Sequence, residues 1–246
     1  MKKIFRTSLF LLITSLFIRC NANYTATHTA INYNQLDSTM TQESRSLAKL
    51  ISPYNEGLEV KMNTVINTSE KDMLKARPEG ILSNFVADLI FEEVNELVGL
   101  TGDLCLLNHG GLRSSLPSGN ITVGNIYQLM PFDNEAVILE LKGEKILEIA
   151  HYLAKSGGEP VSNIQLNLSS PELILVNNKP VNTKTTYNVI TSDYLANGGD
   201  KMYFFENPVS IKKTGLKIRD LIIEHIQEEK EQGRTLNATL DGRLSK

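Results

Sequence analysis

The pattern of apolar and polar positions predicts a chain in which helices and strands are intermixed. Apolar residues recur every three or four positions in several stretches, a spacing typical of helices with one buried face. Elsewhere apolar residues alternate with polar ones or form short unbroken runs, which indicates strands. The predicted helices cover 46–51, 80–98, 143–155 and 219–229. The predicted strands cover 58–66, 103–107, 136–141, 163–168, 172–176 and 186–192.

This order of elements favours a single α/β or α+β domain, without a repeat or an internal linker. A length of 246 residues, 41% of them hydrophobic, is enough for one substantial core. We expect a long polar loop between the strands at 103–107 and 136–141. Cys105 lies in an apolar run and is predicted to be a buried, unpaired thiol. Because Cys20 is the other of the two cysteines, no disulfide framework is expected.

The first 19 residues have the layout of a secretory signal peptide, in which basic residues precede a short apolar run. Cys20 follows this run directly and is predicted to be the lipid-bearing first residue of a bacterial lipoprotein. The alternative is simple cleavage nearby and release of a soluble exported protein. Residues 20–36 are rich in Asn, Thr and Ala and are expected to be a tether, with the domain covering 37–246.

The charge of the mature chain argues against a nucleic-acid partner. Without residues 1–19, which hold four basic residues and no acidic ones, 21 basic residues face 28 acidic ones, a net charge of −7. A polyphosphate backbone would be repelled overall, although single arginines can still hold small anions. The expected location is the periplasm or the outer membrane of a bacterium, with membrane contact only through a lipid anchor.

The segment 192–203 carries the clearest functional pattern. It places the ring of Tyr194 six residues before the carboxylate of Asp200, across the pair Gly198-Gly199. Glycine permits a tight turn, so the ring and the carboxylate can face a common ligand. A flat ring beside an acceptor for hydroxyl groups suggests a nucleoside. The alternatives are a surface aromatic at Tyr194 and a turn residue at Asp200.

A second polar cluster follows the predicted strand at 103–107. Asn108 offers both a donor and an acceptor, Gly110-Gly111 permits close backbone approach, and Arg113 offers a planar fork for an oxyanion or a base edge. Taken alone, the cluster is more typical of a glycine turn in which Asn108 caps backbone groups and Arg113 forms a surface ion pair. Phe132, in the run Pro-Phe-Asp-Asn, is by itself more typical of a core residue than of a ligand contact.

Three motifs occur together and in order: Asn-x-Gly-Gly-Leu-Arg from Asn108, Ile-Thr-x-Gly-x-Ile-Tyr-x-Leu-x-Pro-Phe-Asp-Asn from Ile121, and Asp-Tyr-Leu-Ala-Asn-Gly-Gly-Asp from Asp193. With them, the chain resembles the C-terminal, substrate-binding domain of the 5'-nucleotidase family from about residue 45 to about residue 240. The resemblance implies a mixed sheet with flanking helices and a nucleoside base held between two aromatic rings.

Carried onto this sequence, the resemblance implies that Phe132 and Tyr194 stack on the two faces of the base and that Asp200 binds the ribose hydroxyls. Asn108 and Arg113 would contact the ligand or line the pocket. Arg77 lies near a family position whose arginine reaches the phosphate side. Family members usually carry phenylalanine where this chain has Tyr194, which keeps the ring and adds a hydroxyl.

Full-length members of the family hydrolyse phosphate esters in a separate domain that holds two metal ions. This chain has no Asp-x-His or Gly-Asn-His-Glu segment, and its four histidines, at 28, 109, 151 and 225, are scattered. We therefore expect no catalytic residue, metal site or cofactor here, and His109 is predicted to be structural or at the pocket edge. The first hypothesis is the nucleoside- or nucleotide-binding half of a split 5'-nucleotidase, which does not hydrolyse alone and needs a separately encoded metallophosphatase with divalent metals. The alternatives are a non-catalytic nucleoside-binding surface lipoprotein and a descendant with a collapsed pocket.

Overall fold

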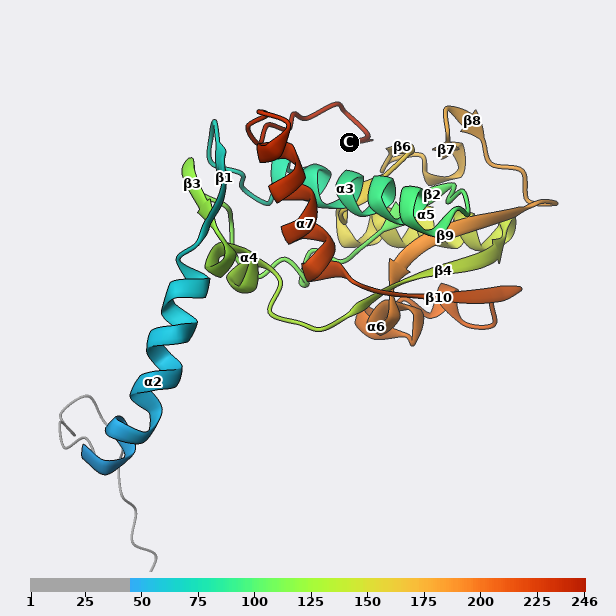
Figure 1. The fold of residues 1–246 in the computed structure, drawn as a ribbon. Coiled ribbons are helices and arrows are strands. Elements are labelled where there is room, and N and C mark those ends of the chain that lie inside the picture. Colours follow the sequence, from blue (N-terminus) through green and yellow to red (C-terminus); the bar gives the residue numbers. More distant parts are fainter. Residues whose placement is uncertain (1–44) are drawn as a thin grey trace, which may run out of the picture. The chain divides into compact units, whose positions relative to one another are not determined.

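The computed structural model describes residues 45–246. Contacts divide the chain into two compact units, 1–48 and 49–246, and the second unit contains the domain discussed below (Figure 1). The predictions of a signal peptide over 1–19, a lipidated Cys20 and a tether over 20–36 fall outside the described residues, as does the predicted domain start at 37.

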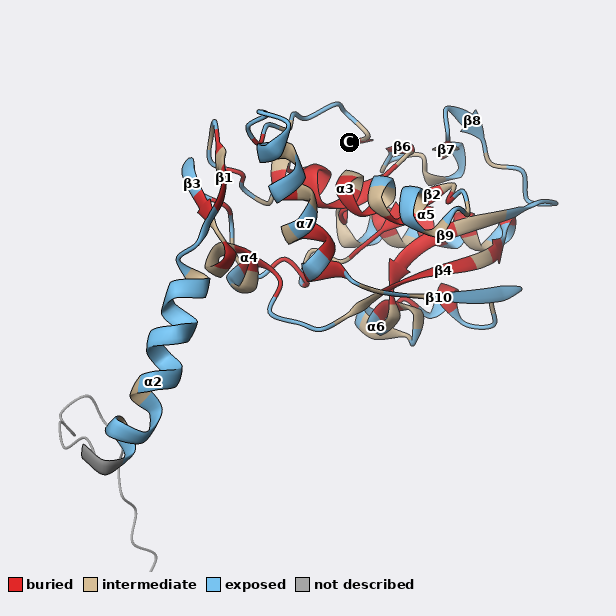
Figure 2. Cartoon of the chain, in the orientation of Figure 1, coloured by how far each residue is buried: buried red, intermediate tan, exposed pale blue. Residues whose placement is uncertain are grey.

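A five-stranded mixed sheet forms the centre of the domain, in the order β10-β4-β9-β2-β5. Strand β9 pairs parallel with β2 and antiparallel with β4, while β10 and β5 lie at the two edges and are antiparallel to their neighbours. The strands are β2 (Leu104–Leu106), β4 (Glu135–Lys142), β5 (Val161–Ser162), β9 (Thr186–Ser192) and β10 (Ser210–Lys217). The central strands are buried and β10 is mostly exposed (Figure 2).

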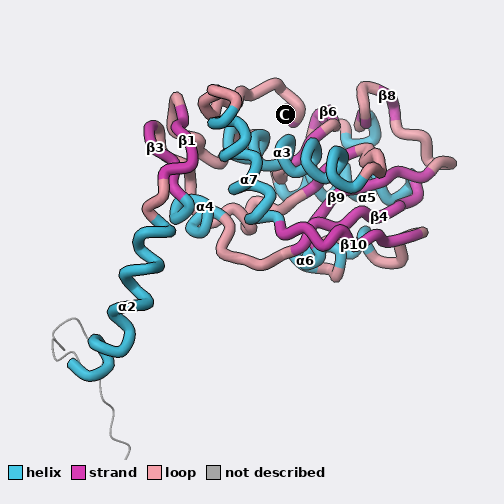
Figure 3. Tube along the Cα trace, in the orientation of Figure 1, coloured by secondary structure: helices cyan, strands magenta, loops and turns pink. Residues whose placement is uncertain are grey.

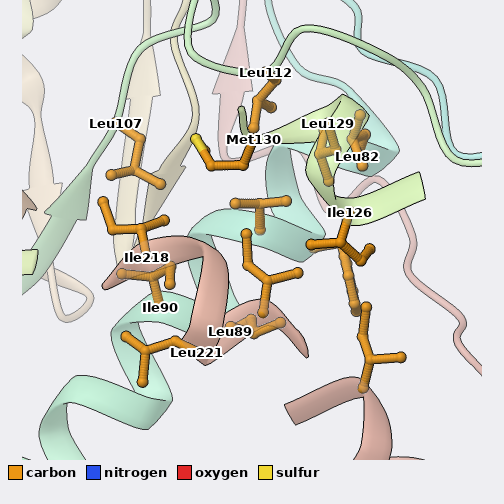
Figure 4. Close-up of a cluster of buried hydrophobic side chains, with 14 of the residues drawn as sticks. Leu82, Leu89, Ile90, Leu107, Leu112, Ile126, Leu129, Met130, Ile218 and Leu221 are labelled. Atoms are coloured by element: carbon orange, nitrogen blue, oxygen red, sulfur yellow. The ribbon is translucent and has the colours of Figure 1, made fainter. Parts of the chain in front are cut away.

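Because successive side chains of a strand point to opposite faces, the central strands supply two hydrophobic cores. In β4, Ala136 and Ile138 belong to one core, and Leu139 and Leu141 to the other. Helices α3 (Ile81–Val98) and α7 (Ile218–Glu231) cover the first face, and α5 (Gly143–Ser156) covers the second. Figure 4 shows part of the first core, where α3 and α7 pack together.

Two smaller sheets complete the domain. Strand β1 (Val65–Ser69) pairs antiparallel with β3 (Gly119–Thr122). The other sheet has the order β11-β6-β7-β8. Its strands are β6 (Ile164–Asn167), β7 (Leu175–Val176), β8 (Lys179–Pro180) and β11 (Leu244–Ser245).

The structure confirms the mixed α/β class and the strongest periodic elements. The predicted helices at 80–98, 143–155 and 219–229 correspond to α3, α5 and α7, and the predicted strands at 103–107, 136–141, 163–168 and 186–192 correspond to β2, β4, β6 and β9. Of the predicted strand at 172–176, only β7 is extended, because Pro171–Leu173 forms a 3-10 turn. Cys105 is buried and free, as predicted, and burial raises the pKa of its thiol.

The prediction of a strand over 58–66 is wrong for its first half. The predicted helix at 46–51 is real but continues as α2 (Arg45–Met62), and only Val65 and Ile66 of the predicted strand belong to β1. Alternation signals a strand only when a partner buries one face. Leu58 and Val60 are instead 53% and 75% exposed, so the segment satisfies its backbone within a helix.

The long loop predicted after β2 is also wrong, because 108–134 contains β3 and the helix α4 (Val123–Leu129) (Figure 3). A capping box starts this helix: the Thr122 hydroxyl accepts from the Asn125 N–H, and the Asn125 side chain accepts from the Thr122 N–H. The helix ends before Pro131, which cannot continue it. This short helix fixes where the segment that carries Phe132 leaves the first core.

Candidate functional site

The ends of β2 and β9 and the start of β4 meet along one edge of the central sheet, the edge that runs across the strand ends (Figure 1). Since β2 and β9 are parallel neighbours, Asn108 after β2 and Tyr194 after β9 reach the same edge. Strand β4 runs the other way, and its Ala136 pairs with Ser192 at the end of β9. Phe132, which precedes β4, therefore arrives at this edge as well.

The residues at this edge surround a cavity of about 340 Å³. It brings together five of the six binding residues that the sequence predicted, together with two glycines and a second asparagine. The lining residues are Asn108, Gly110, Gly111, Arg113, Phe132, Asn134, Tyr194 and Asp200. The pocket is therefore open, which contradicts the alternative of a collapsed descendant.

Both aromatic rings remain accessible in this cavity. Phe132 is 40% exposed and Tyr194 is 47% exposed. Neither ring is part of a hydrophobic core, so the alternative interpretation of Phe132 as a core residue is wrong. Tyr194 lies in the short helix α6 (Asp193–Ala196), whose first turn is capped by the Ser192 hydroxyl accepting from the Leu195 N–H.

Asp200 is held by groups of this chain from three directions. Its Oδ2 accepts from Asn108 Nδ2 at 2.6 Å, and its Oδ1 accepts from the Tyr194 hydroxyl at 3.0 Å. Its N–H donates to the Tyr194 oxygen at 3.3 Å, and its carbonyl accepts from the hydroxyl of Tyr152 at 3.1 Å. These partners stabilise a backbone φ of +51°, a left-handed conformation that is unfavourable for a residue with a side chain. The carboxylate is thus fixed toward the cavity before any ligand arrives.

Gly199 and Gly111 are required because other side chains of the site pack directly against their Cα atoms. A Cβ at Gly199 would lie 2.5 Å from Cε1 of the Tyr194 ring, and a Cβ at Gly111 would lie 2.6 Å from Asn108 Oδ1. A larger residue at either position would displace the ring or the amide. The absence of a side chain therefore sets the position of two groups that face the cavity.

Arg113 supplies the positive charge of the cavity lining. Its backbone N–H donates to Leu129 O at 2.8 Å, which anchors the residue, and its Nη1 reaches Gly110 O at 3.4 Å. The side chain is exposed, so most of the guanidinium donors point to solvent. The structure does not place this arginine in a surface ion pair with a carboxylate of the described residues.

Arg77 is outside the lining of this cavity. Its guanidinium donates to Ser156 O and forms an ion pair of 2.9 Å with Glu159, whose side chain is 5% exposed. The second oxygen of Glu159 accepts from the His109 N–H at 2.6 Å. Arg77 is therefore linked to the glycine loop through Glu159. Burial, followed by the charges of Arg77 and Lys75, lowers the pKa of His109.

The model of the 5'-nucleotidase, C-terminal domain family matches residues 64–207, which is more than half of the chain. The chain belongs to this family. The match includes Arg77, Asn108, Arg113 and the segments that carry Phe132, Tyr194 and Asp200. The resemblance that the three motifs indicated is thus confirmed for the family and for the fold.

Relatives of this 5'-nucleotidase C-terminal domain are longer proteins. Protein UshA of Escherichia coli is 25% identical over 197 residues, which are 76% of this chain and 35% of that protein. The trifunctional nucleotide phosphoesterase protein YfkN of Bacillus subtilis is 25% identical over 187 residues, 66% of this chain and 12% of that protein. A crystal structure of a 5'-nucleotidase precursor from Thermus thermophilus gives a TM-score of 0.68 at 25% identity, covering 81% of this chain and 43% of the other. The chain spans about a third of the length of relatives such as UshA.

Sequence reasoning missed three residues that build the site of this domain. Asn134 lines the cavity and stands in the quoted run Pro-Phe-Asp-Asn, so the motif itself contained the signal. Tyr152 on α5 and Glu159 after it are far in sequence from the residues they hold. No local pattern marks them, because their partners are set by the packing of α5 against the sheet.

Residues 45–246 contain neither a cluster of metal-binding side chains nor a membrane-spanning helix. No group of three or more His, Cys, Asp and Glu side chains in this part of the chain is arranged to hold a metal ion. No helix within the described range is long and apolar enough to cross a bilayer.

Proposed function

We propose that this domain binds a nucleoside or nucleotide, with the base between Phe132 and Tyr194 and the ribose hydroxyls on Asp200. The observation that carries the proposal is the meeting of two accessible rings and one fixed carboxylate in a single cavity. Each oxygen of the Asp200 carboxylate accepts one hydrogen bond within the chain. A carboxylate oxygen has two lone pairs, so each keeps capacity for one hydroxyl of a vicinal diol.

The two rings supply a useful share of the binding energy. Stacking of a base on an aromatic side chain contributes about 1–3 kcal/mol per contact by substitution. Two rings thus contribute roughly 2–6 kcal/mol, against about 8 kcal/mol for micromolar affinity. Hydrogen bonds to Asp200, Asn108 and Arg113 would supply the remainder. Because stacking tolerates every base, the rings alone do not select one.

Arginines are assigned to the phosphate in this proposal. Arg113 offers free donors at the cavity edge and is the first candidate for a phosphate or base-edge contact. Arg77 is proposed to serve the phosphate side as well, as the family resemblance implies. Its side chain is 39% exposed while paired with Glu159, so some of its donors remain accessible.

Calorimetric titration of the purified domain with adenosine and AMP tests the binding proposal. Tyr194→Ala and Asp200→Ala should each reduce the affinity at least fivefold, since one removes a stacking ring and the other removes the diol acceptor. Leu240→Ala, on a residue that is 57% exposed and outside the cavity lining, is the matched control. No heat with any nucleoside or nucleotide would sink the proposal.

We further propose that the domain completes a 5'-nucleotidase together with a separately encoded metallophosphatase that holds the divalent metals. The missing metal-ligand motifs in the sequence and the greater length of relatives named as nucleotidases support this division. Phosphate release from AMP should require both proteins and a divalent metal. Release by the partner alone at the same rate would favour the alternative, a non-catalytic nucleoside-binding lipoprotein. A metallophosphatase reading frame next to this one would favour the split enzyme.

Export to the periplasm or outer membrane is part of the proposal, with residues 1–19 removed and Cys20 lipidated. The basic and apolar layout of the first segment supports it. Labelled palmitate should enter the wild-type protein and not Cys20→Ser. An unlabelled wild type of reduced mass would instead indicate cleavage nearby without a lipid anchor.

A further inference from the structure

Arg219 occupies an unfavourable place for a cation. It lies in the first turn of α7, where the helix dipole disfavours positive charge, and it is only 7% exposed. A buried arginine in this position requires partners for its donors. All hydrogen-bond partners of its guanidinium come from one short segment, residues 130–133, which indicates that Arg219 holds this segment.

The guanidinium of Arg219 binds the segment 130–133, which contains Phe132. Its Nη1 donates to Phe132 O at 3.1 Å and to Met130 O at 3.4 Å, and its Nη2 pairs with Asp133 Oδ1. Its Cζ lies 4.3 Å from the centre of the Tyr127 ring on α4, a cation–π contact. The pair with Arg219 lowers the pKa of Asp133.

These contacts hold Met130, Phe132 and Asp133 in the turn that presents the Phe132 ring. Met130 lies at the end of α4, within the first core, and Glu135 begins β4. Between them, Phe132 is 40% exposed and belongs to neither hydrophobic core. The hydrogen bond from Arg219 to the carbonyl of Phe132 therefore ties the ring-bearing residue to α7.

We infer that Arg219 is a positioning residue: it fixes the segment 130–133 and thereby the Phe132 ring at the cavity, without lining the cavity itself. Arg219 lies beyond residues 64–207, the range that the family model matches. The effect of Arg219 on ligand affinity rests on the proposed nucleoside binding. Its effect on the position of the segment 130–133 is independent of that proposal.

The shape of the arginine side chain is essential to this role. A guanidinium presents five N–H donors in a rigid plane, so one group can serve two carbonyls, a carboxylate and an aromatic face. Lysine keeps the charge but offers a single ammonium, which cannot span these partners. Arg219→Lys should therefore release the segment while keeping the net charge of the protein.

Limited chymotrypsin digestion tests the release of the segment without any ligand. Cleavage of the Phe132–Asp133 bond, identified by mass spectrometry, should be several-fold faster in Arg219→Lys than in wild type. Arg243→Lys is the matched control, because the Arg243 side chain is 10% exposed against 9% for Arg219 and binds Asp88 and Val161 O instead. Equal cleavage at Phe132 in wild type and both variants would overturn the inference.

A double-mutant cycle in adenosine calorimetry tests the consequence for the ring. Arg219→Lys should weaken binding by about 5- to 100-fold, up to the loss caused by Phe132→Ala. In the double variant the two losses should not add, because Arg219 acts through the ring that is already absent. If wild type binds adenosine and the two losses of affinity add fully in the double variant, the inference is overturned. If wild type binds no nucleoside, the proposed function fails, and the digestion still decides whether Arg219 holds the segment.

Discussion

Replacing Tyr194 with phenylalanine removes one hydroxyl from the site and leaves its ring in place. That hydroxyl donates to Asp200 Oδ1 at 3.0 Å and accepts from the Asp200 N–H at 3.3 Å. It thus helps to hold Asp200 at a φ of +51°. A left-handed conformation costs a residue with a side chain about 1–2 kcal/mol, so the contacts of Asp200 are needed to keep it in place.

The expected loss is small because the site keeps other supports for Asp200. A hydrogen bond contributes about 0.5–1.5 kcal/mol, and more when one partner is charged. Tyr194 is 47% exposed and Asp200 is exposed, so the lower part of this range applies. Asn108 and Tyr152 continue to bind Asp200 in the variant. We predict a loss of about 1 kcal/mol, or about fivefold in adenosine affinity.

Calorimetry with adenosine and with 2',3'-dideoxyadenosine separates the hydroxyl from the ring. Tyr194→Phe should lower affinity for adenosine only, because the dideoxy compound has no hydroxyl to place on Asp200. Tyr194→Ala should weaken both ligands, since it also removes stacking of about 1–3 kcal/mol. Tyr54→Phe, on a tyrosine that is 77% exposed on α2, should change neither. An equal loss for both ligands in Tyr194→Phe would refute the role given to the hydroxyl.

Gly199, Glu159 and His109 make contacts in or near the site that a substitution would disturb. Gly199→Ala should reduce adenosine affinity by about 5- to 100-fold, because its Cβ would fall 2.5 Å from the Tyr194 ring and displace it. Glu159→Gln should lower the free energy of unfolding in urea by about 1–2 kcal/mol, because it removes an ion pair with the part-exposed Arg77 while the buried amide keeps the His109 bond. His109 has a lowered pKa in the folded protein, so the unfolded state binds its proton more readily, and stability should fall as the pH drops below about 6.5. In His109→Asn this loss between about pH 6.5 and pH 5 should be reduced.

Each of these predictions has a control and a contrary result. Gly57→Ala, where a Cβ meets nothing within 4 Å, should leave affinity unchanged; unaltered affinity in Gly199→Ala would contradict the close approach. Glu172→Gln, on an exposed turn, should leave urea unfolding unchanged, and an equally small effect in Glu159→Gln would count against its bridging role. His151→Asn, on an exposed helical histidine, should keep the wild-type pH dependence. If both histidine variants behave alike, His109 is not the group that titrates.

Much of the fold could be read from the sequence where burial and periodicity agree. Helix α3 and strand β4 are predicted within one or two residues at each end, because the periodic apolar positions of α3 face a core and the apolar run of β4 is buried on both faces. Where burial and periodicity disagree, the predicted secondary structure is wrong or an element is missed. Residues 58–61 fall in a segment that alternates like a strand, but they remain exposed within α2, and β10 carries too few buried positions to be recognised.

The sequence by itself determined the family and most of the groups that line the cavity. Five of them lie within the three family motifs: Asn108, Arg113, Phe132, Tyr194 and Asp200. Only the tertiary structure decided how these groups are held. The pairing of β2, β9 and β4 brings their ends to one edge, and side chains from α5 and α7 bind Asp200 and the segment 130–133 across long sequence separations. The physical reason is that a hydrogen bond between distant residues depends on packing geometry, which leaves no periodic signal in the chain.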